Sequence, residues 1–166
     1  MRTGPALLST GPAQWLALAA FVAATLAAGV VGSLVTKPSI PGWYASLQKP
    51  AWTPPNWLFG PAWTLLYLMM AVAAWLVWRE RGFGGARLAL ALFAAQLVLN
   101  ALWSILFFGL KSPGAALVEI AFLWAAILAT AAGFWRVTHP AGWLLAPYLC
   151  WVTYAAFLNY AIWRRN

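Results

Sequence analysis

The sequence predicts an all-α integral membrane protein: an up-down bundle of five transmembrane helices with a long ordered loop between the first two. Of its 166 residues, 64% are hydrophobic and only 7% are charged, and the mean hydropathy is +0.79. Soluble domains carry about 25% charged residues, so this chain has too few charges to cover a water-facing surface. Its apolar residues fall into blocks of about 20, the length at which a helix spans a bilayer. We therefore treat residues 1–166 as a single membrane domain.

The five predicted helices cover residues 14–35, 59–78, 86–110, 113–136 and 141–163. The first is longer than the 7–15-residue apolar region of a signal peptide, so we interpret it as a retained span. The second ends at the charged and glycine-rich sequence RERGFGG, and the third ends before KSPG. The fourth begins at Pro113, where the missing N–H costs nothing. In the fifth, Pro147 is expected to kink the helix near Trp151.

Three of the connections are short, which predicts antiparallel neighbours, whereas the first connection covers residues 36–58. It contains the whole stretch KPSIPGWYASLQKPAWTPPNW, with five prolines and three tryptophans. A belt of interfacial aromatics explains the tryptophans but not the prolines. Prolines restrict the loop backbone, so ordering it over a pocket loses less entropy. We expect a stiff lid on which Trp43, Tyr44 and Trp52 face a ligand or anchor at the interface.

The net charge of +8 does not indicate a nucleic-acid-binding protein. The ten Lys and Arg residues stand singly or in pairs at the ends of the apolar blocks, where their side chains reach the lipid headgroups, and they form no basic stripe. Five lie on each side of the predicted bundle: Arg2, Arg79, Arg81, Arg87 and Arg136 on one, and Lys37, Lys49, Lys111, Arg164 and Arg165 on the other. The positive-inside rule therefore assigns no orientation.

Catalytic and metal-binding patterns are not evident in the sequence. It contains no nucleophile–histidine–acid set, no paired carboxylates and no phosphate-binding loop. The single cysteine, Cys150, excludes an intramolecular disulfide and a cysteine-based metal site. The single histidine, His139, is interpreted as a solvated loop residue, which leaves no intramembrane histidine to ligate an iron. We expect no metal site and no required cofactor.

Three of the predicted helices carry a stripe that combines large aromatic residues with an occasional amide. The stripes comprise Trp63, Tyr67 and Met70; Gln96, Asn100 and Trp103; and Tyr148, Trp151, Ala155 and Asn159. Unpaired polar groups are costly in hydrocarbon, so each amide is expected to face a partner or a cavity. Two interpretations stay open. The amides join helices while the tryptophans fill space, or the stripes line a cavity for a flat, mostly apolar ligand.

Two further features have more than one interpretation. Small residues recur every four positions in the first span, at Ala20, Ala24, Ala28 and Gly32, which suits packing within the bundle or a homodimer seam. Glu119 is the only acidic residue within a span. We favour a position near enough to the interface for it to meet water or Lys111. The alternative is a buried proton or cation site.

Three sequence blocks resemble the TspO/MBR family of tryptophan-rich sensory proteins and translocator proteins, whose eukaryotic members are the peripheral-type benzodiazepine receptors. The blocks are GWYASLQKPAWTPPNWLFGPAWTLLY (42–67), AQLVLNALWSILFFG (95–109) and PYLCWVTYAAFLNYAIWRRN (147–166). The similarity runs in order from about residue 35 to residue 166. The W-x-P-P and L-N-x-x-W patterns are its most specific parts.

The resemblance implies a homodimeric five-helix bundle that binds porphyrins, such as protoporphyrin IX and haem, beneath the long first loop. It implies a multi-pass protein of a bacterial cell membrane or, in a eukaryote, of the mitochondrial outer membrane. By motif position, the family tryptophans implicated in light-dependent porphyrin breakdown are Trp63 and Trp151. The pocket asparagine is Asn100, the small pocket residue is Ala155, and the W-Y pair of the loop is Trp43–Tyr44.

Combining the stripes with the resemblance predicts a ligand site of ten residues: Trp43, Tyr44, Trp52, Trp63, Tyr67, Asn100, Trp103, Tyr148, Trp151 and Ala155. The leading hypothesis is a membrane receptor or transporter for porphyrins with a regulatory or stress-response role. One alternative is a light-dependent porphyrin-degrading enzyme in which Trp63 and Trp151 act. Another is a signalling protein whose ligand changes only its partner contacts.

Sterol is a second expected ligand class. Eukaryotic family members bind cholesterol, and the cholesterol-recognition pattern is matched by Leu158, Tyr160 and Arg164. That pattern is weak, because many apolar helices that end in Tyr and Arg match it. At Arg165 the sequence departs from the acidic residue expected in animal members, which affects the expected contact with the sterol headgroup.

Overall fold

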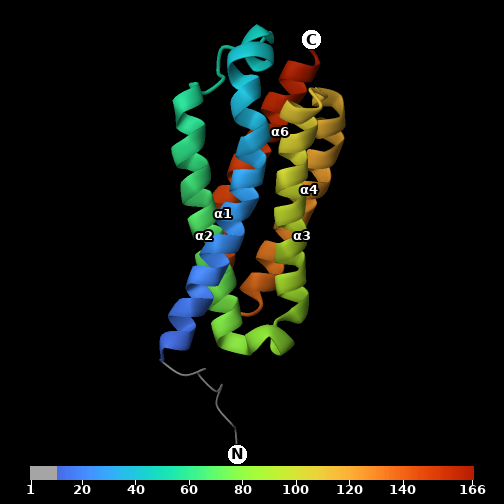
Figure 1. Cartoon of the computed structure of the whole chain (residues 1–166). Helices are drawn as coiled ribbons and strands as arrows, with labels where there is room; N and C mark the ends of the chain where they lie inside the picture. Colours follow the sequence, from blue (N-terminus) through green and yellow to red (C-terminus); the bar gives the residue numbers. More distant parts are fainter. Residues whose placement is uncertain (1–10) are drawn as a thin grey trace, which may run out of the picture.

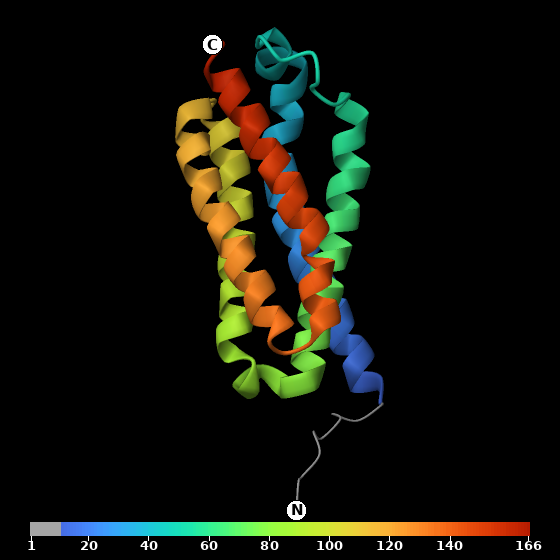
Figure 2. The ribbon, with the colours of Figure 1, turned by 180° about the vertical axis from the view of Figure 1, so that it is seen from behind.

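A computed structural model describes residues 11–166, and within that range all regular structure is helical. Arg2, counted above in the charge balance, lies outside the described residues. Five helical segments are long and apolar enough to cross a membrane: Pro12–Tyr44, Asn56–Gly85, Arg87–Gly109, Pro113–Trp135 and His139–Trp163. They run alternately up and down (Figure 1), which confirms the predicted helical bundle. The view from behind shows the last segment crossing the bundle obliquely (Figure 2).

The helices have the following bounds. α1 (Pro12–Ser39) continues through a π-helical turn, η1 (Ile40–Tyr44); α2 is Asn56–Gly85; α3 (Arg87–Ser104) continues through a second π-helical turn, η2 (Ile105–Gly109); α4 is Pro113–Trp135; α5 is His139–Leu144; and α6 is Ala146–Trp163. The predicted third and fourth spans therefore agree with the structure to within one or two residues.

The predicted lid loop, residues 36–58, is wrong in its first half. The chain stays helical through Pro38 and the π-helical turn to Ser46. In a bilayer the backbone must be hydrogen-bonded within the chain, so proline does not force a helix to end there as it does in water. The carbonyls at this helix end are capped by Lys49, whose ammonium donates hydrogen bonds to the carbonyls of Tyr44 and Leu47 at 2.6 and 3.0 Å. The loop itself is limited to residues 47–55.

Two other boundaries differ from the prediction. α2 extends beyond residue 78 and bends at Gly82, whose φ of 62° and ψ of −178° are accessible to glycine. The fifth span is divided at Leu145, shortly before Pro147, rather than near Trp151. Proline has no N–H for the carbonyl four residues earlier and disfavours helix in the preceding residue, so the break precedes it.

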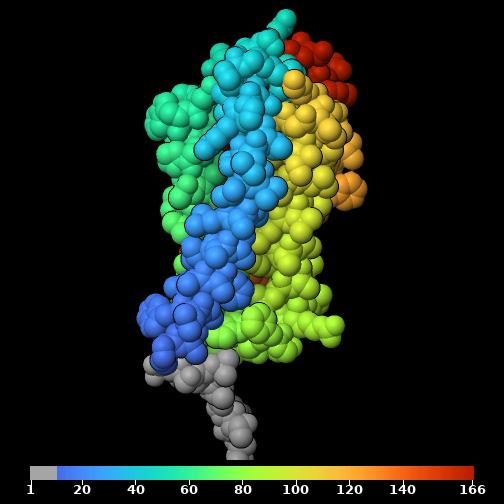
Figure 3. Space-filling model, in the orientation of Figure 1, coloured from blue at the N-terminus to red at the C-terminus, as the bar shows by residue number. Residues whose placement is uncertain are grey.

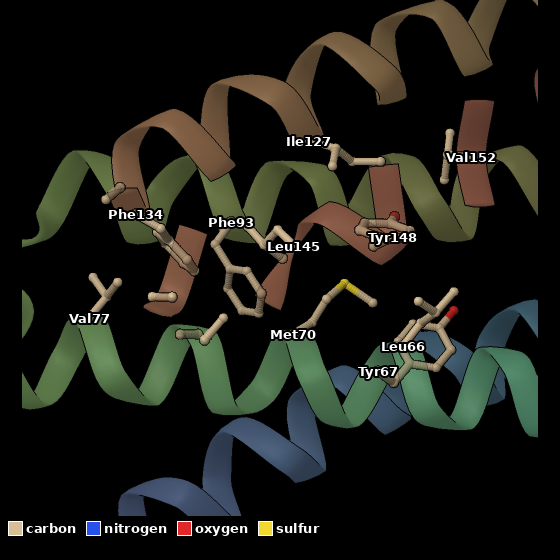
Figure 4. Packing of buried hydrophobic residues seen from close by; sticks show 14 of the residues in the cluster. Leu66, Tyr67, Met70, Val77, Phe93, Ile127, Phe134, Leu145, Tyr148 and Val152 are labelled. Carbon is tan, nitrogen blue, oxygen red and sulfur yellow. The ribbon is translucent and has the colours of Figure 1, made fainter. Parts of the chain in front are cut away.

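The half of the bundle farther from the loop is filled by side chains. Buried residues from α2, α3, α4 and the last span interlock there, among them Met70, Phe93, Ile127 and Phe134 (Figure 4). Space for a ligand is therefore expected in the other half of the bundle, next to the loop. The core therefore acts as a rigid base beneath that space.

The small-residue stripe of the first span is divided between two environments. Gly32 is buried, and a Cβ placed on it would lie 3.0 Å from the Oγ of Ser104 in α3. Ala28 is half-buried, whereas Ala20 and Ala24 are exposed. The part of the stripe nearer the loop, Ala28 and Gly32, therefore packs within the bundle. A homodimer seam at its lower part stays a prediction.

Candidate functional site

A cavity of about 640 Å³ occupies the loop-proximal half of the bundle. Its walls come from the C-terminal half of α1, the N-terminal half of α2, the C-terminal half of α3, α4 and α6. Cavities of roughly 300–1,000 Å³ are typical of small-molecule sites. The cavity is therefore large enough to hold a ligand within a single copy of the chain.

Seven of the ten residues predicted for the ligand site line this cavity: Tyr44, Trp63, Tyr67, Asn100, Trp103, Trp151 and Ala155. The other three do not line it. Tyr148 is buried directly behind the wall and bonds to Asn100. Trp43 packs edge-on against Phe107, with ring centroids 5.5 Å apart. Trp52 is exposed in the loop.

A buried chain of hydrogen bonds fixes the floor of the cavity. The Tyr67 hydroxyl donates to Oδ1 of Asn100 at 2.6 Å, and Nδ2 of Asn100 donates to the Tyr148 hydroxyl at 3.0 Å. One amide therefore joins α2, α3 and α6 while it also faces the cavity. The two interpretations left open by the sequence, helix joining and cavity lining, both apply to Asn100.

Asn159, the amide predicted on the last span, has a similar double role. Its Oδ1 accepts a hydrogen bond from the Trp103 indole at 3.1 Å, and its Nδ2 donates to the carbonyl of Pro113 at 2.7 Å. Asn159 also lines the cavity. These bonds fix the orientation of the Trp103 ring, which stacks on Phe107 with centroids 5.1 Å apart.

Two tryptophans form a corner in the cavity wall. The rings of Trp63 and Trp151 are nearly perpendicular, at 84°, with centroids 6.4 Å apart. Trp63 also stacks on Tyr67 at 5.5 Å and meets the edge of Tyr148 at 6.1 Å. Such a corner offers a flat ligand one ring face for stacking and one ring edge for a T-shaped contact, the two preferred aromatic geometries.

Hydrogen bonds with Tyr154, Arg165 and Asn166 attach the loop to the C-terminal segment. The Tyr154 hydroxyl donates to the carbonyl of Trp52 at 2.8 Å, and the two rings pack edge-on. Farther along, the backbone N–H of Gln48 donates to Oδ1 of Asn166 at 3.0 Å, and Nδ2 of Asn166 donates back to the Gln48 carbonyl at 3.2 Å. These contacts support the predicted stiffness of the loop. The Trp52 side chain is exposed at the outer side of the loop and does not line the cavity.

Sequence reasoning missed the wall contributed by α1. That wall includes Gly29, Ser33, Thr36 and Lys37. A search for large aromatic and amide side chains excludes small residues, and the small-residue stripe of α1 predicts only helix packing. The change from alanine to glycine, serine and threonine along its C-terminal half is the signal that could have identified the wall.

Glu119 does not lie where the favoured interpretation placed it. It is only 6% exposed, and neither carboxylate oxygen has a hydrogen-bond partner among residues 11–166. The favoured prediction, that Glu119 meets water or Lys111, is therefore wrong. The described part of the chain has no group of three or more His, Cys, Asp or Glu side chains that could hold a metal ion. The alternative of a buried proton or cation site at Glu119 stays a prediction.

The residues of the sterol pattern do not share a surface. Leu158 is buried and lines the cavity, whereas Tyr160 and Arg164 are exposed on the outside of the C-terminal helix. A single sterol molecule would have to meet them from two sides of the helix. Sterol binding stays a prediction, and this geometry does not strengthen it.

A model of the TspO/MBR family matches residues 21–164. The chain belongs to the TspO/MBR family. It is 47% identical to the tryptophan-rich protein TspO of Archaeoglobus fulgidus over 91% of this chain and 97% of that one. It is 41% identical to the tryptophan-rich sensory protein of Cereibacter sphaeroides, with coverage of 92% and 93%, and 39% identical to the translocator protein of Bos taurus, with coverage of 92% and 91%.

Membership in the TspO/MBR family and the five apolar helices identify an integral membrane protein with a receptor or sensor role. The similarity to relatives extends over almost the whole chain, so it includes every wall of the cavity. The family resemblance inferred from the three sequence blocks is confirmed.

Proposed function

We propose that this TspO/MBR family member is a membrane receptor that binds porphyrins, such as protoporphyrin IX or haem, in the cavity. The observation that carries the proposal is the perpendicular pair Trp63 and Trp151 above the Asn100 hydrogen bonds. A porphyrin is flat, aromatic and largely apolar, so ring stacking and shape would supply most of its affinity. Few polar groups are needed to orient such a ligand.

Titration with protoporphyrin IX should quench the tryptophan fluorescence of the purified protein saturably, with micromolar or tighter affinity. Replacing Trp151 with alanine removes one ring contact, worth about 0.5–1.5 kcal/mol, and should weaken binding about two- to tenfold. Trp143→Ala is the matched control, because Trp143 is exposed on α5 and does not line the cavity. Quenching that does not saturate, or equal affinities in the two variants, would contradict the proposal.

The same tryptophan pair favours a second candidate function, light-driven oxidation of the bound porphyrin with dioxygen as the oxidant. The excited macrocycle would take one electron from an adjacent indole and pass it to dioxygen, which forms superoxide. The superoxide would then add to the macrocycle as the indole radical cation regains its electron, so the net reaction is addition of dioxygen to the porphyrin. Trp63 and Trp151 are adjacent, and both line the cavity that would hold the porphyrin. This activity requires no metal ion.

Illumination of a one-to-one complex, followed by porphyrin absorbance, tests the enzymatic proposal. We expect Trp63→Phe/Trp151→Phe to degrade porphyrin at least about tenfold more slowly than the wild type at equal occupancy, while Trp143→Phe degrades it at the wild-type rate. Equal rates in the double variant would rule out the two indoles as donors. Degradation of more than one porphyrin per protein, when fresh ligand is supplied, distinguishes catalysis from a single damaging event.

A further inference from the structure

The cavity opens sideways, between α1 and α2. Its exposed lining residues come only from these two helices: Leu26, Val30 and Lys37 from α1, and Asn56, Trp57, Gly60 and Thr64 from α2. Every lining residue from α3, α4 and α6 is buried or half-buried. The two helices cross in the lower part of the bundle and diverge toward the loop (Figure 1), and the space-filling view shows this face of the molecule (Figure 3). The opening therefore faces lipid.

Polarity changes along this opening. Leu26 and Val30 form its lower edge, whereas Lys37 stands higher on α1, roughly 16 Å from Leu26 by helix rise. On α2, Asn56 lies at the same upper end, in the first turn of the helix. A ligand in the opening would thus have an apolar environment toward the membrane interior and a cationic one toward the interface.

Lys37 is the only charged residue that lines the cavity within residues 11–166. The whole chain has two acidic residues, and neither lines the cavity: Glu80 is near the far end of α2, and Glu119 is buried in α4. Lys49, by contrast, is already bound to backbone carbonyls at the end of the first helix. The ammonium of Lys37 is therefore a cation at the cavity opening, where neither carboxylate side chain of this sequence lies to neutralise it.

We propose that Lys37 is a specificity-determining residue whose ammonium binds the anionic group of an amphipathic ligand. The apolar body of that ligand would lie against Trp63 and Trp151, and its anionic end would remain at the membrane interface. This proposal rests on the proposed function and narrows it to ligands that carry a carboxylate. A charge-assisted hydrogen bond at an exposed position favours the charged ligand about three- to tenfold over a neutral one.

Protoporphyrin IX and its dimethyl ester are a matched pair of probes, because they share the macrocycle and differ in the two carboxylates. Both are titrated into the full chain in nanodiscs of phosphatidylcholine. The porphyrin is then the only net-anionic amphiphile present, so a weaker affinity in a variant reflects the porphyrin carboxylate and not a lipid headgroup. The variants are Lys37→Gln, Lys37→Arg and Lys111→Gln. Lys111 belongs to the turn that joins η2 to α4, which lies at the same end of the bundle as the loop (Figure 1), and it does not line the cavity.

We expect the wild type to prefer the free acid by about three- to tenfold. Lys37→Gln should lower the affinity for the free acid to that for the ester and leave the affinity for the ester unchanged. Lys37→Arg and Lys111→Gln should retain the wild-type preference for the free acid. Equal weakening of both probes in Lys37→Gln, or no weakening of the acid, would overturn the assignment of Lys37. A wild type that binds both probes equally would also overturn it while leaving the proposed function intact. A wild type that binds neither would refute the proposed function itself.

Discussion

Replacing Asn100 with leucine is expected to lower the free energy of unfolding by about 1–3 kcal/mol. The substitution keeps the side-chain size but leaves the hydroxyls of Tyr67 and Tyr148 without their partner. In water-soluble proteins each unpaired buried group costs about 1–3 kcal/mol. Hydrogen bonds between membrane helices contribute less, on average about 0.6 and at most about 1.7 kcal/mol, because the helices also find partners when they are dissociated. Two such bonds give the expected range.

The matched control for Asn100 lies one turn earlier on the same helix. Gln96 is equally buried, but its Oε1 has no partner among the described residues, and its Nε2 meets only the sulfur of Met70 at 3.7 Å. Gln96→Leu removes an unsatisfied polar group, so we expect a change within about 0.5 kcal/mol or a gain in stability. Reversible unfolding in mixed micelles, followed by circular dichroism, compares the two variants. Equal destabilisation would show that the Asn100 bonds contribute nothing beyond side-chain volume.

The second large effect is expected from Gly29→Ala. A Cβ at this position would lie 2.5 Å from Cε2 of Tyr67 and 3.0 Å from its Cδ2. The ring cannot readily turn aside, because its hydroxyl is bonded to Asn100. Either α1 moves away from α2 or the Tyr67–Asn100 bond breaks. Overpacking of this kind costs about 1–3 kcal/mol, and we expect porphyrin affinity to fall as well.

Two comparisons identify the cause of the Gly29 effect. Gly60→Ala places the same methyl group on the opposite side of the opening, where no atom lies within 4 Å, and should change stability by less than about 1 kcal/mol. In a Tyr67→Leu background, Gly29→Ala should cost much less than in the wild type, because the obstructing ring is absent. Additive destabilisation in that double variant would mean that the steric contact with Tyr67 is not the cause.

The sequence is most informative where a residue has few possible roles in a membrane. Asn100 within an apolar helix needs a partner or a cavity, and the periodic spacing of Trp63, Trp151 and Ala155 places them toward it. The helices are predictable for a related reason, since lipid allows no other open-ended structure. Each of these inferences depends on a cost that the bilayer imposes on one residue type.

Errors arise where the chain uses residues with common roles. The sequence alone presents Lys37 as a lysine that reaches the headgroups, and only the three-dimensional arrangement shows that it borders the cavity. Gly29 is one of 13 glycines, and its importance depends on the position of the Tyr67 ring. Pro38 is expected in a loop because proline ends helices in water. These roles depend on tertiary neighbours that no local pattern specifies.

The sideways opening between α1 and α2 changes which concentration governs occupancy. An amphipathic ligand that enters from lipid equilibrates first with the bilayer, so the protein responds to its mole fraction in the membrane. Dissociation constants expressed per litre of water will then shift with the amount of lipid in the assay, even when the protein is unchanged. At a fixed total amount of ligand, a cell could therefore lower occupancy by making more membrane, because added lipid lowers the mole fraction of the ligand in the bilayer.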